Sequence, residues 1–348
     1  MSLRLGRTPA GPGKLNTATA PDTYTRAKRG ATSAETLSRQ AVAVVSTTSI
    51  TNRARDGSAR RSTQHITGAA AFLALTFAWS WMLWGALAAT RLPAFSAPGL
   101  LLLLLGGVGP SLVGAALLLR AAGRSERESF LSRLFSPRRL PLIWAGLAVL
   151  VPPCLTVSAL QADLWTGGSS TSPLDAMLMV KPGTLLSLVL QMLVGGALAE
   201  EIGWRGYALD RMQSHLSPLV ASISLGVAWA LWHAPLFLIS GTAQAELGLF
   251  SIGAMLFAVC VIAQSVLFTW IYNHTRRSIL AAIVLHFSID FSLTLFSGIG
   301  HAQTLSAMGW RTGLYVAAAI VVVLASAHSW TAARPENQTR ARLGRQPA

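Results

Sequence analysis

The residues of this 348-residue chain that can do chemistry begin with two adjacent glutamates in an apolar segment. Arg205 follows Glu201 by four residues, which is one helical turn along the same face. We therefore expect Arg205 to be the structural partner that keeps Glu201 ionised. Glu200 is rotated about 100° from Glu201 on a helix, so it is left free to face another group. A free carboxylate in such a place can act as a general base.

Two histidines in other apolar segments extend this constellation. His286 precedes Asp290 by four residues, so on a helix the carboxylate can orient the imidazole. His233 stands just before Pro235, which breaks or kinks a helix and frees backbone groups nearby. Two carboxylates, two histidines and an arginine on three helices predict a water-activating site that is sealed from lipid.

The composition shows what surrounds these residues. Apolar residues make up 52% of the chain and charged residues only 12%, and the mean hydropathy is +0.50. An ordinary soluble domain has about 25% charged residues, so this chain lacks the polar surface of a soluble fold. Of thirteen acidic residues, only Glu200, Glu201 and Asp290 fall inside apolar blocks. Charged groups at membrane depth are costly and mark functional sites.

The apolar residues form blocks close to the length of about 20 residues that a membrane-spanning helix needs. The fold class predicted is all-α, a polytopic membrane bundle of about eight transmembrane helices. We expect spans at 66–89, 98–119, 141–160, 183–209, 218–239, 249–272, 279–298 and 312–328.

Basic residues on the flanks predict the orientation. With the N-terminus inside, the cytoplasmic flanks hold seventeen Lys or Arg residues, and the outer connections hold three, Arg91, Lys181 and Arg311. Since Lys and Arg favour the cytoplasmic side, we expect a multi-pass protein of the cell membrane with both termini in the cytoplasm.

The two tails are basic. Residues 1–65 contain eleven basic and three acidic residues and a single aromatic residue, Tyr24. So little apolar surface predicts a disordered tail that contacts anionic lipid. We expect a helical domain at 66–328 and a basic cytoplasmic tail at 329–348. Although the net charge is +15, its concentration in the tails favours membrane lipid over nucleic acid as the partner.

The motifs match a known family. The chain resembles the CPBP family of CAAX proteases and bacteriocin-processing enzymes, which includes type II CAAX prenyl endopeptidases. That family has the motifs Glu-Glu-x-x-x-Arg, Phe-x-x-x-His and His-x-x-x-Asn. The first matches in full at Glu200. The second matches at His233 with Trp229 in place of Phe, and the third matches at His286 with Asp290 in place of Asn. The resemblance covers about residues 66–328, and it implies that this helical domain is a CPBP-like intramembrane protease domain.

The resemblance implies peptide-bond hydrolysis within the membrane near the cytoplasmic face, with a protein or peptide substrate. It implies catalytic roles for five residues: Glu200, Glu201, His233, His286 and Asp290. Glu200 would take a proton from water that His233 positions, and His286 with position 290 would stabilise the oxyanion. An ionised Asp290 accepts hydrogen bonds but cannot donate one. It is therefore either protonated or only orients His286.

Three alternatives stay open. No cofactor is required, but a divalent metal such as zinc could be held by Glu200, His233 and His286, which are common zinc ligand types. An inactive family member could serve as a membrane scaffold or immunity protein, in view of Trp229 and Asp290. A transporter or proton relay would also use intramembrane carboxylates and histidines.

Overall fold

The computed structural model describes residues 67–298 and 304–331. All regular elements within these ranges are helices, and none is a strand. Seven helices are long and apolar enough to cross a membrane, or eight spans if one bent pair counts as a single crossing. The fold is therefore an all-helical membrane bundle, as the composition predicted.

The spans follow the chain in the order Thr67–Thr90, α2 (Ala97–Gly107) with α3 (Gly109–Ala121), α5 (Leu142–Trp165), Pro182–Met212, α10 (Pro218–Trp232), α12 (Ile252–His274), α13 (Ile279–Ser297) and α14 (Leu305–Ala325). The fourth span consists of α7 (Pro182–Leu190), a π-helical stretch (Gln191–Leu198), α8 (Ala199–Gly203), a second π-helical stretch (Trp204–Leu209) and α9 (Asp210–Met212). The shorter helices are α4 (Arg124–Phe135), α6 (Pro173–Leu178), α11 (Ala243–Leu247) and α15 (Ala327–Thr331), with 3₁₀ turns at Pro137–Arg139 and Ala234–Leu238.

Two predicted spans show the largest differences from the structure. The span expected at 98–119 is two helices, α2 and α3, bent by 43° where they meet. The break follows from Pro110, which has no N–H to donate and is favoured in a first helical turn. The last span begins at Leu305 instead of 312, because the Thr304 side chain accepts from the Ala307 N–H and caps the helix.

The earlier start of α14 corrects the placement of Arg311. The sequence placed this residue in an outer connection, but it lies within α14 and is 7% exposed. Asp163 and Asp210 also lie inside long helices, α5 and the fourth span, and not in connections. Each has its own partners at the end of its helix: Ser170 and Thr304 for Asp163, and Arg133 and Tyr272 for Asp210.

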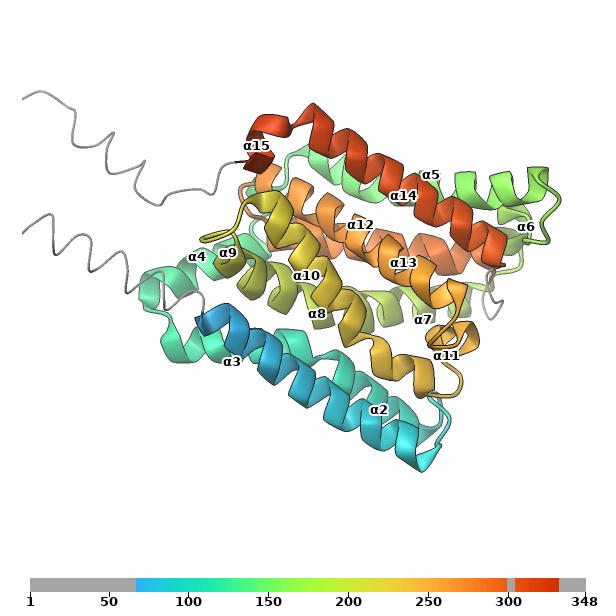
Figure 1. Ribbon diagram of the computed structural model, residues 1–348, viewed down its shortest axis with the longest axis horizontal. Coiled ribbons are helices and arrows are strands. Elements are labelled where there is room, and N and C mark those ends of the chain that lie inside the picture. The colour runs from blue at the N-terminus through green and yellow to red at the C-terminus, as the bar shows by residue number, and fades with distance from the viewer. Residues whose placement is uncertain (1–66, 299–303, 332–348) are drawn as a thin grey trace, which may run out of the picture. The chain divides into compact units, whose positions relative to one another are not determined.

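Hydroxyl side chains fix several other helix starts. Ser217, Ser251 and Ser278 each accept from the N–H three residues later, which begins α10, α12 and α13. α12 and α13 are the most enclosed helices, with 56% of their apolar windows buried against 22% for α5. α10, α12 and α14 run side by side (Figure 1), and α13 packs on α5 and on the first π-helical stretch.

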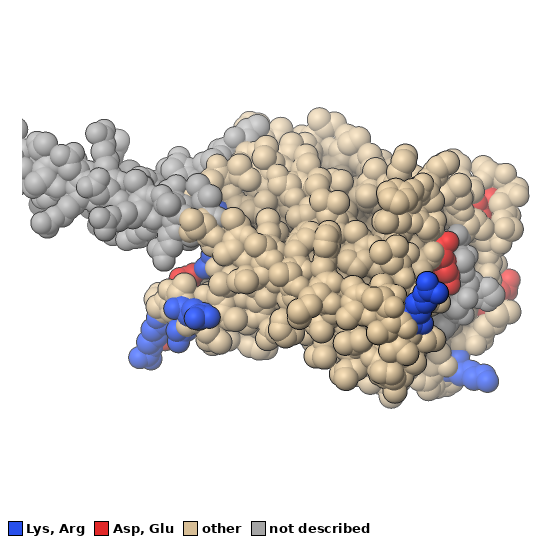
Figure 2. All heavy atoms as spheres, turned by 60° about the horizontal axis from the view of Figure 1, so that its bottom comes forward, with Lys and Arg blue, Asp and Glu red and all other residues tan. Residues whose placement is uncertain are grey.

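The surface agrees with a membrane setting. Figure 2 shows one face as a broad band without charged residues, and the Lys, Arg, Asp and Glu side chains gather towards its two ends. Large apolar side chains are exposed on the outer helices, for example Leu142 on α5 and Leu324 on α14. The predicted tail 1–65, and all of 329–348 except the last three residues of α15, fall outside the described residues.

Candidate active site

The two glutamates lie on a single short turn of α-helix between two π-helical stretches. α8 (Ala199–Gly203) carries both, and the π-helical stretches on either side widen the helix. π-helical turns are rare, and they frequently occur at functional sites. Glu200 is 7% exposed and Glu201 is fully buried, so the helix turns both carboxylates into the protein.

Close packing against α3 holds this turn in place. A Cβ added at Gly203 would lie 2.1 Å from the Pro110 carbonyl oxygen, so only glycine permits this approach. The Ser111 hydroxyl also donates to the Leu198 carbonyl at 2.8 Å, across the same contact. The glycine after the Glu pair therefore sets the position of the pair relative to the bundle.

One carboxylate oxygen of Glu201 is in contact with two side chains. Its Oε1 accepts from Arg205 at 2.6 Å and from His286 Nδ1 at 2.7 Å, while its Oε2 has no hydrogen-bond partner. The Arg205 guanidinium is fully buried and stacks on the rings of Phe268 (3.9 Å) and Trp229 (4.5 Å). The Glu201–Arg205 pair matches the spacing, whereas the bond to His286 joins two helices and was not predicted.

Glu200 has a different partner. Its Oε2 accepts from the indole Nε1–H of Trp229 at 2.6 Å. The same ring lies edge-on to His286 and to Phe268, with centroids 5.5 and 5.6 Å away. The sequence identified Trp229 only as a departure from phenylalanine. Phenylalanine has no N–H, so the departure itself was the available signal for this bond.

His286 is held at both ring nitrogens. Nδ1 faces Glu201, and Nε2 lies 3.2 Å from Asp290 Oδ2. Gly196 makes room for this pair, because a Cβ there would be 3.1 Å from Asp290 Oδ2. The Asp290 side chain is 33% exposed, the most open among the residues that contact His286. The predicted i, i+4 contact between His286 and Asp290 is therefore present.

His233 joins the cluster from the end of α10. It is the C-cap residue of that helix, followed by the 3₁₀ turn that begins just before Pro235. Its Nδ1 lies 2.7 Å from the Trp229 carbonyl oxygen. A carbonyl only accepts, so Nδ1 carries the proton and Nε2 of a neutral ring is an acceptor. The ring interacts electrostatically with His286 and Asp290.

The donor arrangement does not fit the zinc set Glu200, His233 and His286. Both nitrogens of His286 are engaged by carboxylates, so this ring has no lone pair free for a metal. Among the residues that the structure describes, no group of three or more His, Cys, Asp or Glu side chains is placed to hold a metal ion.

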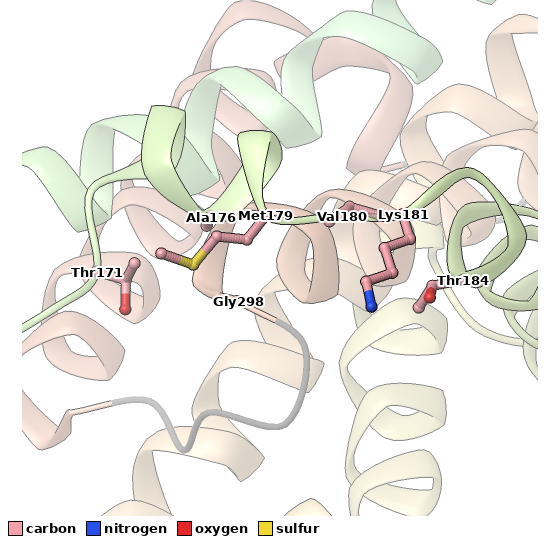
Figure 3. A pocket seen from close by; sticks show the side chains of 7 residues that line it. All are labelled: Thr171, Ala176, Met179, Val180, Lys181, Thr184 and Gly298. Carbon is pink, nitrogen blue, oxygen red and sulfur yellow. The ribbon is translucent and has the colours of Figure 1, made fainter.

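Two pockets lie away from this cluster. A pocket of about 270 Å³ is lined by Thr171, Ala176, Met179, Val180, Lys181, Thr184 and Gly298, where the α6–α7 connection faces the end of α13 (Figure 3). A second, of about 320 Å³, is a groove between the helix Thr67–Thr90 and α10, lined mainly by apolar residues such as Leu73, Phe77 and Leu231. Neither is lined by a predicted site residue.

Comparison with known proteins identifies the family. The profile of the Rce1-like type II CAAX prenyl endopeptidase family matches residues 182–292, the stretch that carries all six predicted site residues. CAAX prenyl protease 2 of Methanococcus maripaludis is 30% identical over 199 residues, which is 57% of this chain and 73% of that protein. The chain therefore belongs to the Rce1-like type II CAAX prenyl endopeptidase family of membrane peptidases.

Proposed function

We propose that the chain is an active endopeptidase in which Glu200 is the general base that activates water. The observation that carries the proposal is that the two glutamates have different hydrogen-bond partners. Glu201 is committed to Arg205 and His286, whereas Glu200 meets only the Trp229 N–H. One oxygen of Glu200 therefore stays available to accept a proton.

These groups can carry out each proton transfer that hydrolysis requires. Glu200 takes a proton from water while the water oxygen attacks the peptide carbonyl carbon. The same proton then passes from Glu200 to the leaving amine as the C–N bond breaks. The unprotonated Nε2 of His233 is suited to accept the second O–H of that water. The products are a new carboxylate and a free amine.

His286 is suited to the oxyanion. Glu201 at Nδ1 fixes the ring orientation and balances a positive charge on it, so that Nε2–H can donate to the oxygen that becomes negative. Asp290 contacts that same nitrogen. This contact supports the role of Asp290 in orienting His286 over the role of a protonated donor.

The proposed hydrolysis uses no metal, because His286 is engaged at both nitrogens. Chelation with 1,10-phenanthroline or EDTA is expected to leave the purified enzyme active within about two-fold. Loss of cleavage that zinc restores would favour the metal alternative.

The substrate proposed is a peptide presented at the membrane. The family name directs the first probe, a farnesylated peptide ending in a Cys-aliphatic-aliphatic-X sequence with a free carboxyl terminus, beside the same peptide without the lipid. The relative in Methanococcus maripaludis has the name of a CAAX prenyl protease, which supports this choice.

The test of activity is cleavage by purified protein in liposomes, read by mass spectrometry. Wild type and Glu246→Gln, a change at an exposed glutamate on α11, should cleave equally, and Glu200→Gln should not. A folded wild type that cleaves neither these peptides nor a membrane-protein digest would favour the scaffold alternative. Proton uptake coupled to solute movement would favour the transporter alternative.

We also place the Glu pair near the cytoplasmic face, with both termini inside. Single cysteines at Ser169 and Ser125 mark opposite ends, since α5 between them is 24 residues long, about 36 Å. In a Cys154→Ser background, an impermeant thiol reagent should label position 169 from outside and position 125 only after lysis. The reverse pattern would overturn the orientation.

A further inference from the structure

Positive charge is in excess at the end of the bundle that carries α4 (Figure 1). Nine arginines lie there against three carboxylates, and all three carboxylates are already in ion pairs. These pairs are Glu126 with Arg211, Glu128 with Arg124, and Asp210 with Arg133 and Arg277. Among the residues that the structure describes, no carboxylate lies within ion-pair distance of the other five, Arg120, Arg127, Arg138, Arg139 and Arg276. An anion from outside the protein would complement this charge.

Three of these five arginines meet where the α4–α5 connection touches the turn between α12 and α13. Arg139 Nη1 donates to the Arg276 carbonyl oxygen at 2.6 Å, and its Nε donates to the Ser132 hydroxyl at 3.1 Å. The side chains of Arg138 and Arg276 are exposed, and within the described part of the chain neither has a hydrogen-bond or ion-pair partner. We call Arg138, Arg139 and Arg276 the basic corner.

An aromatic stack beside the basic corner indicates its depth in the membrane. Trp144, in the first turn of α5, stacks on His274 at the end of α12, with ring centroids 5.0 Å apart. Trp270 contacts both rings. Tryptophan is enriched at the level of the lipid headgroups. Arg276 follows His274 and Arg139 precedes Trp144 by only a few residues, so the basic corner lies beside that level, where lipid phosphates are found.

Apolar side chains continue this surface towards the bilayer. Leu142 and Ile143, in the first turn of α5, are 88% and 69% exposed. They begin a helix that is long and apolar enough to span a membrane, so they face acyl chains. A phospholipid joins an anionic phosphate to apolar chains and therefore complements both the arginines and these two residues. A soluble anion complements the arginines alone.

We propose that the basic corner is a docking surface for an anionic phospholipid of the bilayer, with Arg138 and Arg276 as the charge partners of its headgroup. Guanidinium groups bind phosphate through parallel hydrogen bonds. Arg139 holds the two sides of the surface together through its bond to the Arg276 backbone. The bound lipid links the α4–α5 connection to the α12–α13 turn and so stabilises the folded bundle. The proposal depends neither on the peptidase function nor on which side of the membrane this end faces.

The test is thermal unfolding of the full chain in nanodiscs of phosphatidylcholine alone and in nanodiscs that also contain phosphatidylglycerol. A lipid that binds the folded state raises the melting temperature, and we expect a rise of about 2–4 °C for wild type. Arg138→Gln/Arg276→Gln should lose most of this rise. In phosphatidylcholine it should melt like wild type, because neither side chain has a protein partner to strand. A lower melting temperature there would assign these arginines a structural role and overturn the proposal.

The matched control is Arg91→Gln/Lys181→Gln, which removes the same amount of charge from exposed positions. Arg91 follows one span and Lys181 precedes another, each at the end of its span that is remote from Arg211. Arg91 also has a positive φ, as Arg276 has. The control should keep the rise that phosphatidylglycerol gives. An equal loss in the two double variants, or no rise in wild type, would overturn the docking surface.

Two further measurements identify the ligand. Native mass spectrometry of protein released from the mixed nanodiscs should find more phosphatidylglycerol retained on wild type than on Arg138→Gln/Arg276→Gln, and equal retention would count against the basic corner. Inorganic phosphate added to phosphatidylcholine nanodiscs should give no rise in melting temperature. A rise equal to that with phosphatidylglycerol would assign the site to free phosphate and overturn the lipid. Neither measurement involves cleavage, so failure of the peptidase function leaves this test intact.

Discussion

Two carboxylates in this molecule, the partly buried Asp210 and the fully buried Glu201, lie in the same long helix and have different surroundings. Asp210 uses both oxygens: Oδ2 accepts from Arg133, and Oδ1 accepts from the Tyr272 hydroxyl at 2.8 Å and faces Arg277 at 3.3 Å. Glu201 takes Arg205 and His286 on a single oxygen and leaves the other without a donor.

We infer from this difference that the Asp210 cluster is a structural clamp and that Glu201 belongs to the proposed active site. The Asp210 cluster joins α4, α9 and the end of α12, so its satisfied bonds tie three elements together. A buried oxygen without a donor costs about 1–3 kcal/mol, and such a cost is expected where capacity to bind another group is kept. Glu200, beside Glu201, accepts from a single donor, the Trp229 N–H, so it too leaves one oxygen without a donor. The comparison predicts effects on activity at one cluster and on stability at the other.

The largest expected effect is that of Glu200→Gln. Removal of the proposed general base should lower kcat on the order of 1,000-fold and leave the melting temperature within a degree or two of wild type. The measurement is steady-state cleavage of the lipidated peptide beside thermal unfolding in the same detergent. Near-normal turnover in this variant would show that the base lies elsewhere.

Arg205→Met is expected to lower stability as well as activity. The change strands the fully buried Glu201 carboxylate, at a cost of about 3–5 kcal/mol. The matched control is Arg124→Met on α4, which breaks an arginine–glutamate pair of the same spacing at exposed positions. Exposed pairs contribute about 0–1 kcal/mol, so the control should unfold like wild type. Equal melting temperatures for the two variants would contradict the buried-pair assignment.

Arg133→Gln tests the clamp. Burial acts to lower the pKa of Arg133, but its interactions and hydrogen bonds with Tyr272 and Asp210 raise its pKa above the ordinary value, so the residue stays charged at any working pH. Loss of this charge should destabilise the protein by about 1–3 kcal/mol while kcat stays unchanged well below the melting temperature. A kcat that falls with intact folding would mean that the clamp also positions the catalytic turn.

Trp229→Phe tests the indole bond to Glu200. The variant keeps the ring that contacts Arg205 and His286 but removes the N–H, so kcat should fall on the order of 10-fold with little change in KM. The pH profile of kcat should move as well, because the carboxylate loses a donor. A variant with a normal kcat and a normal pH profile would show that Trp229 contributes only by packing.

The smallest effect is expected for Asp290→Asn. An asparagine carbonyl can still accept from His286 Nε2, and its N–H₂ can donate to the oxyanion. Activity should therefore stay within about three-fold of wild type or rise, whereas Asp290→Ala should lose more. A large loss in Asp290→Asn would mean that the negative charge beside His286 is itself required.

The sequence alone determined the features that depend on local spacing. Long apolar blocks gave the membrane bundle, because a helix is the only single-segment structure that satisfies its backbone in lipid. The period of 3.6 residues predicted the contacts of Glu201 with Arg205 and of His286 with Asp290. Both pairs are present at 2.6 and 3.2 Å.

Only the tertiary structure decided which helix faces meet. Membrane helices are apolar all round, so periodicity does not mark the inward face. The bonds from Trp229 to Glu200 and from His286 to Glu201 span 29 and 85 residues of sequence, and they depend on how α8, α10 and α13 pack. The burial of Arg311 was missed for a related reason: a charge lowers local hydropathy, so the predicted span began after it. Packing of one face of α14 against α12 and α5, which hydropathy does not encode, buries this residue.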